Sequence, residues 1–210
     1  MGLGEQRSEQ ILRSTFRPLC QVKFPYYQGR QKRYHTFDLA HPTMPAGFED
    51  YSTLVIDLCD AANAHEGEAH LTIDEKIIAA GMSQRRPKPH VDGCFRVDGD
   101  RAYWGGGGPQ WLHFCNDVGA SAIGRMAVIV AASLPGCRAW KGVFNERPAK
   151  DGDLSHIQTQ LGEGEVLKAN TAYLLSPDCV HESMTFDQQV LRTFLRIALP
   201  VSFSEACVWD

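Results

Sequence analysis

The spacing of hydrophobic residues changes near residue 85 of the chain. Before that point, three segments have the periodicity expected of helices. The first, residues 5–15, places Ile11, Leu12 and Phe16 along one side. The second, residues 51–64, suits either a helix or a buried strand, but its length and alanine-rich end favour the helix.

The third segment, residues 71–82, carries polar residues where a helix is expected to begin. Thr72 suits an N-cap, Asp74 and Glu75 would lie in the first turn, and Gly81 comes near the end. We therefore predict a helix over residues 71–82.

Short β-like segments separated by Gly, Pro, Asn and Asp follow residue 85. They span residues 88–97, 125–134, 138–144, 165–176 and 189–199. Helices followed by a series of strands are typical of an α+β protein, here a mainly β one. We expect the strands to form a sandwich or barrel with the N-terminal helices packed outside it.

The composition is that of one globular domain. A length of 210 residues with 43% hydrophobic residues suffices for a single core, so residues 1–210 are expected to form one domain. Residues 1–84 would be an N-terminal arm with supporting helices, and residues 85–200 the core. The net charge of −4 excludes binding of nucleic acid by bulk charge. Scattered cysteines, no secretory signal and no membrane-spanning run predict a cytoplasmic protein without a membrane partner.

A candidate metal site begins in the first β-like segment, where His90 and Asp92 flank Val91. Alternate residues of a strand point to the same side, so this imidazole and this carboxylate would enter one cavity. Both groups bind divalent transition metals. The alternative is a solvated pair at a turn, because an H-x-D sequence arises often by chance in a chain with eight histidines.

Two arginines in the last β-like segment call for anionic partners. Arg192 and Arg196 have the same strand parity, whereas the opposite face of that strand is apolar. A buried guanidinium is costly without an anion, and a carboxylate is its strongest partner. Three roles stay open for Arg196: a second contact to the same anion as Arg192, a contact to a substrate anion, or exposure at the end of the strand.

The order His90, Asp92, His181 and then Arg192 resembles that of the Fe(II)/2-oxoglutarate-dependent dioxygenases. These are double-stranded β-helix (jelly-roll) enzymes whose metal is held by two histidines and one carboxylate. The resemblance covers residues 85–200. It implies that His90, Asp92 and His181 are the metal ligands and the catalytic centre, and that Arg192 binds the far carboxylate of 2-oxoglutarate.

The same resemblance implies a hydroxylase acting on a small polar or anionic substrate, such as an amino acid or a related metabolite. Fe(II), 2-oxoglutarate and O₂ would take part, with release of succinate and CO₂. Asp92 fills the ligand position that halide needs, which favours hydroxylation over halogenation. Arg196 is a second candidate for cosubstrate binding. The pattern identifies neither the substrate nor the oligomeric state.

Two regions allow alternative interpretations. The basic, aromatic residues 16–35, with Arg85, Arg86 and Lys88, suit a nucleobase-modifying or nucleic-acid-modifying member of the same superfamily, but the net charge favours an arm packed on the core. Residues 93–124 are an insertion, and their glycine run at 105–111 suits either a lid or a flexible loop.

Two proteins of other classes also fit the pattern. One is a cupin-like metal protein, which needs no 2-oxoglutarate and has no use for Arg192. The other is a non-enzymatic β-sandwich binding module, in which His90 and His181 would lie apart.

Overall fold

The computed structural model describes residues 11–97, 101–105, 126–146, 148–149 and 152–209. The described chain is mainly β, and its paired strands are antiparallel. A mainly β fold is therefore confirmed. Within this part of the chain, no helix has the length and apolar character needed to cross a membrane.

The largest sheet has six strands in the order β2-β11-β7-β13-β4-β3. They are β2 (Phe16–Gln21), β3 (Gln31–Asp38), β4 (Glu68–Ile78), β7 (Val128–Ala132), β11 (Thr171–Leu175) and β13 (Val190–Ala198). Residues 16–35 thus contribute to both edge strands. This part of the expected N-terminal arm is integrated into the sheet.

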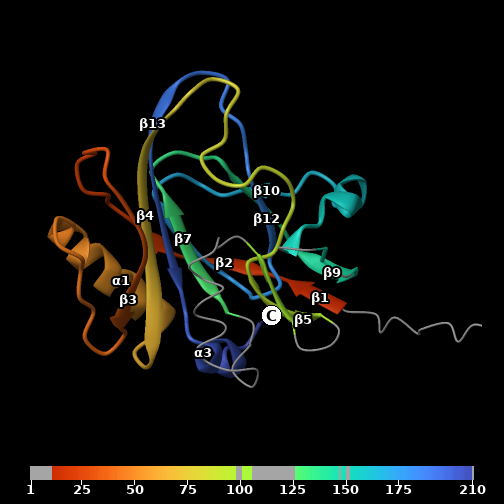
Figure 1. Cartoon of the computed structure of the whole chain (residues 1–210), viewed down its shortest axis with the longest axis horizontal. Coiled ribbons are helices and arrows are strands. Elements are labelled where there is room, and N and C mark those ends of the chain that lie inside the picture. Colours follow the sequence, from red (N-terminus) through yellow and green to blue (C-terminus); the bar gives the residue numbers. More distant parts are fainter. Residues whose placement is uncertain (1–10, 98–100, 106–125, 147, 150–151, 210) are drawn as a thin grey trace, which may run out of the picture.

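A smaller sheet faces the large one and has the order β10-β8-β12 (Figure 1). Its strands are β8 (Cys137–Trp140), β10 (Glu165–Val166) and β12 (Val180–Ser183). Two further strand pairs are β1 (Ile11–Ser14) with β9 (Gly142–Asn145), and β5 (Gly93–Val97) with β6 (Arg101–Gly105). Of the predicted insertion, residues 93–124, the structure describes only β5 and β6. The predicted lid, residues 105–111, lies outside the described residues except for Gly105.

Figure 1 shows α1 (Ser52–Ala62) on the opposite side of the large sheet from β10 and β12. The helix confirms the prediction for residues 51–64. The other helical segments are η1 (Glu49–Tyr51), η4 (Ser155–Gln160) and α3 (Val201–Ala206).

Strand β13 separates two hydrophobic cores. Its Leu195 and Ile197 belong to the core that contains buried residues of α1, such as Leu58. Its Phe194 and Ala198 belong to the core between the two sheets. The alternation follows from the strand geometry, in which successive side chains point to opposite faces. Polar residues on the second face of β13 therefore point into the space between the sheets.

The helix predicted over residues 71–82 is wrong, because most of that segment forms β4. Asp74 and Glu75, which suggested the first turn of a helix, are buried on opposite faces of the strand. The whole of β13 pairs with β4 in continuous register from Val190↔Ile78 to Ala198↔His70. This long pairing outweighs the local helix signals, because strand formation depends strongly on tertiary context.

The helix predicted over residues 5–15 is also wrong where the structure describes it. Residues 11–14 form β1, which pairs with β9 through Leu12↔Phe144. Leu12 is fully buried and Ile11 is exposed, which is the alternation of a strand. The β-like segments 125–134, 138–144, 165–176 and 189–199 contain strands as predicted, and 88–97 contains β5.

Candidate metal centre

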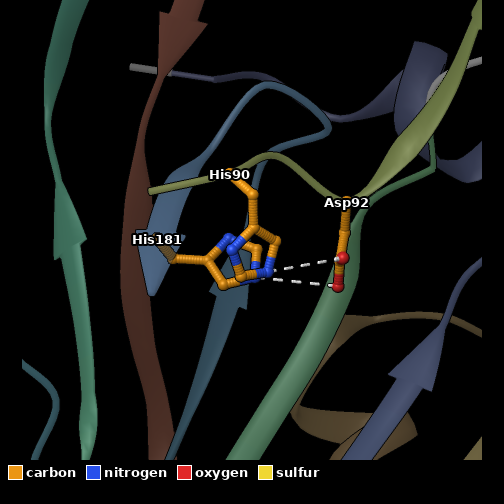
Figure 2. A group of neighbouring side chains, drawn as sticks. All are labelled: His90, Asp92 and His181. Atoms are coloured by element: carbon orange, nitrogen blue, oxygen red, sulfur yellow. Dashed lines mark ion pairs between the residues drawn. The ribbon is translucent and has the colours of Figure 1, made fainter. Parts of the chain in front are cut away.

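His90, Asp92 and His181 lie together and are all buried. Their ligand atoms are within 4.8 Å of one another. Figure 2 shows both imidazoles directed towards the Asp92 carboxylate. Nε2 of His90 is 4.0 Å from Oδ1 of Asp92, and Nε2 of His181 is 3.7 Å from Oδ2. The sequence prediction that these three residues could form a metal site is confirmed to that extent.

The backbone brings the two histidines together. The N–H of His90 donates to the carbonyl of His181, and the N–H of His181 donates to the carbonyl of His90, both at 2.9 Å. This isolated antiparallel bridge places the ring centroids 4.4 Å apart. The binding-module alternative, in which the histidines would lie apart, is therefore wrong on this point.

Each histidine is oriented through its other ring nitrogen. Nδ1 of His90 lies 2.8 Å from the Lys88 carbonyl, and Nδ1 of His181 lies 2.9 Å from the Cys179 carbonyl. A carbonyl only accepts, so a neutral imidazole donates from Nδ1 and keeps its lone pair on Nε2. A backbone carbonyl on the second nitrogen is a usual means of orienting a histidine ligand.

The electrostatic environment suits metal binding. Burial, reinforced by the neighbouring His181, lowers the pKa of His90 to about 3. Burial on its own raises the pKa of Asp92, but the Arg196 guanidinium and the His181 imidazole outweigh it and hold that pKa below its ordinary range. His90 is thus neutral and Asp92 ionised at neutral pH, which are the states that a metal requires.

The three side chains line a cavity of about 240 Å³, which also has five arginines in its wall. These are Arg33, Arg85, Arg86, Arg192 and Arg196. The carboxylates in the same wall are Asp92 and Glu182. The described lining is therefore strongly cationic.

Arg192 is almost completely buried, with 1% of its surface exposed. Its Nε donates to the Leu134 carbonyl at 3.0 Å, and its Nη1 donates to Oε1 of Gln84 at 2.5 Å. No carboxylate of a described residue lies within 4.0 Å of this guanidinium, so its partners in the chain are neutral. Burial lowers the pKa of Arg192 to about 10.

Arg196 is also buried, and its Nε lies 3.2 Å from Oδ2 of Asp92. Exposure at the strand end, one of the three roles considered for Arg196, is therefore wrong. Its anionic partner within the chain is a candidate metal ligand. Its predicted part in cosubstrate binding stays a prediction.

Gln84 is a member of this site that sequence reasoning missed. Its Nε2 donates to the Asp74 carbonyl of β4, while its Oε1 accepts from Arg192 of β13. A glutamine in an irregular segment carries no recognisable pattern, so no signal in the sequence could have identified it.

Comparisons of the chain with protein-family models, with curated proteins and with solved structures find no match. A functional conclusion therefore depends on the geometry and charge of this cavity.

Proposed function

We propose that the chain is an Fe(II)- and 2-oxoglutarate-dependent oxygenase that hydroxylates a small polar or anionic substrate and releases succinate and CO₂. The observation that carries the proposal is the position of Arg192 in the wall of the cavity that holds the two histidines and Asp92. A two-histidine, one-carboxylate set leaves coordination positions open and is the ligand set of non-haem Fe(II) oxygenases. A buried guanidinium that has no carboxylate partner among the described residues suits the second carboxylate of 2-oxoglutarate.

The arrangement of the sheets supports this proposal. We take the large and small antiparallel sheets as the two halves of a double-stranded β-helix. Arg192 and Arg196 come from the large sheet and His181 comes from the small one, so the cavity lies between the halves. A cupin-like protein would share these sheets but would have no use for Arg192.

The residues of the chain have separate tasks in this function. Bound Fe(II), with 2-oxoglutarate and O₂, supplies the oxidising chemistry. His90 and His181 present their Nε2 atoms, and Asp92 presents a carboxylate held by Arg196. Arg192 fixes the orientation of the cosubstrate. Apolar groups of the wall, such as Phe194, keep water from the reacting atoms.

The test is an anaerobic titration of the metal-free protein with Fe(II) and then with 2-oxoglutarate. We expect tight iron binding, followed by the weak visible charge-transfer band that such a chelate produces. Arg192→Gln should weaken 2-oxoglutarate binding by about tenfold or more, because a charged hydrogen-bonded contact is lost. Arg17→Gln, which removes an exposed arginine from β2, is the charge-matched control.

The other outcomes contradict the proposal in different ways. Iron binding without the band would indicate a cupin-like metal protein. Retention of iron binding in His181→Ala, as in the control His156→Ala, would contradict the assignment of His181 as a ligand, since His156 is outside the triad. Failure of the unmodified protein to bind iron would overturn the metal centre itself.

A further inference from the structure

The cavity has more positive charge than metal and cosubstrate binding requires. Of its arginines, Arg196 lies against Asp92, and Arg86 lies 2.8 Å from Asp153. Glu182, the second carboxylate of the wall, is 3.3 Å from Arg138, which does not line the cavity. The proposed function assigns Arg192 to 2-oxoglutarate. Arg85 and the exposed Arg33 then remain in the cavity wall without a task.

Arg85 has donors available for a ligand. Its guanidinium lies 5.5 Å from the centroid of the Phe194 ring. Phe194 itself stands between Arg192 and Arg196 in the sequence of β13. Among the described residues, the carboxylate within 4.0 Å of Arg85 is that of Asp74, whose Oδ2 is 3.7 Å from Nη1 of Arg85, too far for a hydrogen bond. Neither carboxylate oxygen of Asp74 has a hydrogen-bond partner in the described structure. The guanidinium of Arg85 makes no hydrogen bond to a described residue.

Asp74 does not depend on Arg85 for its counter-charge. Nζ of Lys76 is closer to it, at 3.4 Å from Oδ2. Lys76 does not line the cavity, whereas Arg85 does. The pair formed by Asp74 and Lys76 is therefore balanced, and the charge of Arg85 is directed to the cavity.

Metal and cosubstrate leave this excess in place. A divalent metal ion adds two positive charges, and 2-oxoglutarate brings two negative ones. The loaded cavity thus keeps the cationic character that its described residues give it. A guanidinium that stays partly desolvated is stabilised by an anion, which it binds best in a two-pronged contact.

We propose that Arg85 binds an anionic group, a carboxylate or a phosphate, of the primary substrate. The inference rests on the proposed function and names the substrate class of the same site. Arg33, an exposed arginine of β3 in the cavity wall, adds positive charge for the approach of an anion. A cavity of about 240 Å³ is small for a ligand site, so the substrate is a small molecule.

The experiment uses the full chain loaded with Mn(II) and N-oxalylglycine, an unreactive analogue of 2-oxoglutarate. The proposed metal site and the proposed cosubstrate site at Arg192 are then both filled. Calorimetric titrations with inorganic phosphate and with acetate then measure binding at the remaining site. We expect one of these anions to bind, and Arg85→Gln to weaken that binding by about tenfold or more. Arg17→Gln should leave it within a factor of about two, since exposed charges contribute little.

Arg85→Lys keeps the positive charge beside Asp74. It provides a second test of the anion site if Arg85→Gln fails to fold. We expect this variant to fold and to bind the anion less well than the unmodified protein, because an ammonium lacks the planar fork of a guanidinium. Unfolding midpoints of all variants are measured alongside. Equal anion affinity in the unmodified, Arg85→Gln and Arg85→Lys proteins would overturn the proposal, as would the absence of binding to the unmodified protein.

The iron and 2-oxoglutarate titration separates this inference from the proposed function. Arg85→Gln should leave the charge-transfer band intact. Loss of the band in that variant would make Arg85 a cosubstrate residue and overturn its role with the substrate. If the unmodified protein lacks the band but still binds phosphate through Arg85, the oxygenase assignment fails and the anion site stands.

Discussion

Nε of Arg196 lies 3.2 Å from Oδ2 of Asp92, so an arginine of β13 holds the carboxylate of the candidate metal centre. Both side chains are buried. In the metal-free protein, this guanidinium is the nearest compensation for the charge of Asp92. A metal ion bound to Asp92 would supply a second.

Arg196→Gln should therefore destabilise the metal-free protein by about 3 kcal/mol, the cost of leaving a buried charge unpaired. The loss should be smaller with saturating Mn(II), because the metal then neutralises Asp92. Urea unfolding with and without Mn(II) measures both values. The double variant Arg196→Gln with Asp92→Asn is the control, and its metal-free loss should be smaller than that of Arg196→Gln. An equal loss with and without metal would show that Asp92 is not a ligand.

Glu75 anchors the loop before β3 to the large sheet. Its Oε2 accepts from the N–H groups of Gln28 and Arg30, and its Oε1 accepts from the hydroxyl of Tyr51. Burial on its own raises the pKa of Glu75, but these hydrogen bonds outweigh it and the pKa is lowered. Glu75→Gln replaces one acceptor oxygen with a donor group.

This substitution should lower the free energy of unfolding by about 2–4 kcal/mol, because buried hydrogen-bonding groups lose their charged acceptor. Chemical denaturation is the measurement, with Glu66→Gln at an exposed position as the control. Since Glu75 is on the α1 side of the sheet, iron affinity should not change. A change in iron affinity comparable to that of a triad variant would contradict this separation.

Gly162 and Gly164 in the turn before β10 provide a matched pair. Both have left-handed φ values, +67° and +69°. A Cβ at Gly164 would lie 2.6 Å from Nε1 of Trp140, whereas a Cβ at Gly162 would meet nothing within 4 Å. Gly162→Ala should cost about 1–2 kcal/mol from backbone strain alone.

Gly164→Ala should cost more than Gly162→Ala, because the indole of Trp140 must move as well. Urea unfolding followed by tryptophan fluorescence gives both costs, and the emission of the native state reports on the indole. Equal costs for the two variants would mean that Trp140 adapts without penalty.

The lowered pKa of His70 predicts that the protein loses stability in mild acid. Burial, together with the charge of Arg196, lowers that pKa to about 4. An unfolded histidine titrates near 6.5, so the unfolded chain takes up a proton between pH 6.5 and pH 4 that the folded chain does not. Stability present above pH 6.5 is therefore lost as the pH falls to 4, by up to about 3 kcal/mol.

His70→Gln should reduce this slope by the contribution of one proton. Part of the slope should remain, since His90 also has a lowered pKa, about 3. The measurement is urea unfolding of the metal-free protein over this pH range. His65→Gln controls for removal of a histidine from the surface. An unchanged slope in His70→Gln would contradict the assignment.

The sequence predicted the candidate metal centre better than the elements around it. His90 and Asp92 are recognisable because strand parity joins them locally, and His181 followed from the resemblance. The parity of Arg192 and Arg196 also placed both of them in the cavity wall. Which anion each arginine meets depends on Asp92 approaching from another segment, and this a single strand cannot indicate.

The error at β4 has a similar cause. Thr72, Asp74 and Glu75 imitate the start of a helix because β13, the strand that pairs with them, is distant in sequence. Tyr51 and Arg30, which bind the Glu75 carboxylate, are also far from it along the chain. By contrast, α1 was predictable because its alanine-rich end and its length are local properties.

The mutual hydrogen bonds between His90 and His181 also bear on synthesis and assembly. His90 leaves the ribosome long before His181, and β4 leaves it long before its partner β13. A nascent chain that ends before β12 therefore has two of the three candidate ligands, and its β4 has no β13 to pair with. Chains dominated by such distant pairings fold slowly. The candidate metal site is therefore expected to form only once β12 has been synthesised, and products truncated before it should neither bind a metal ion tightly nor resist proteolysis.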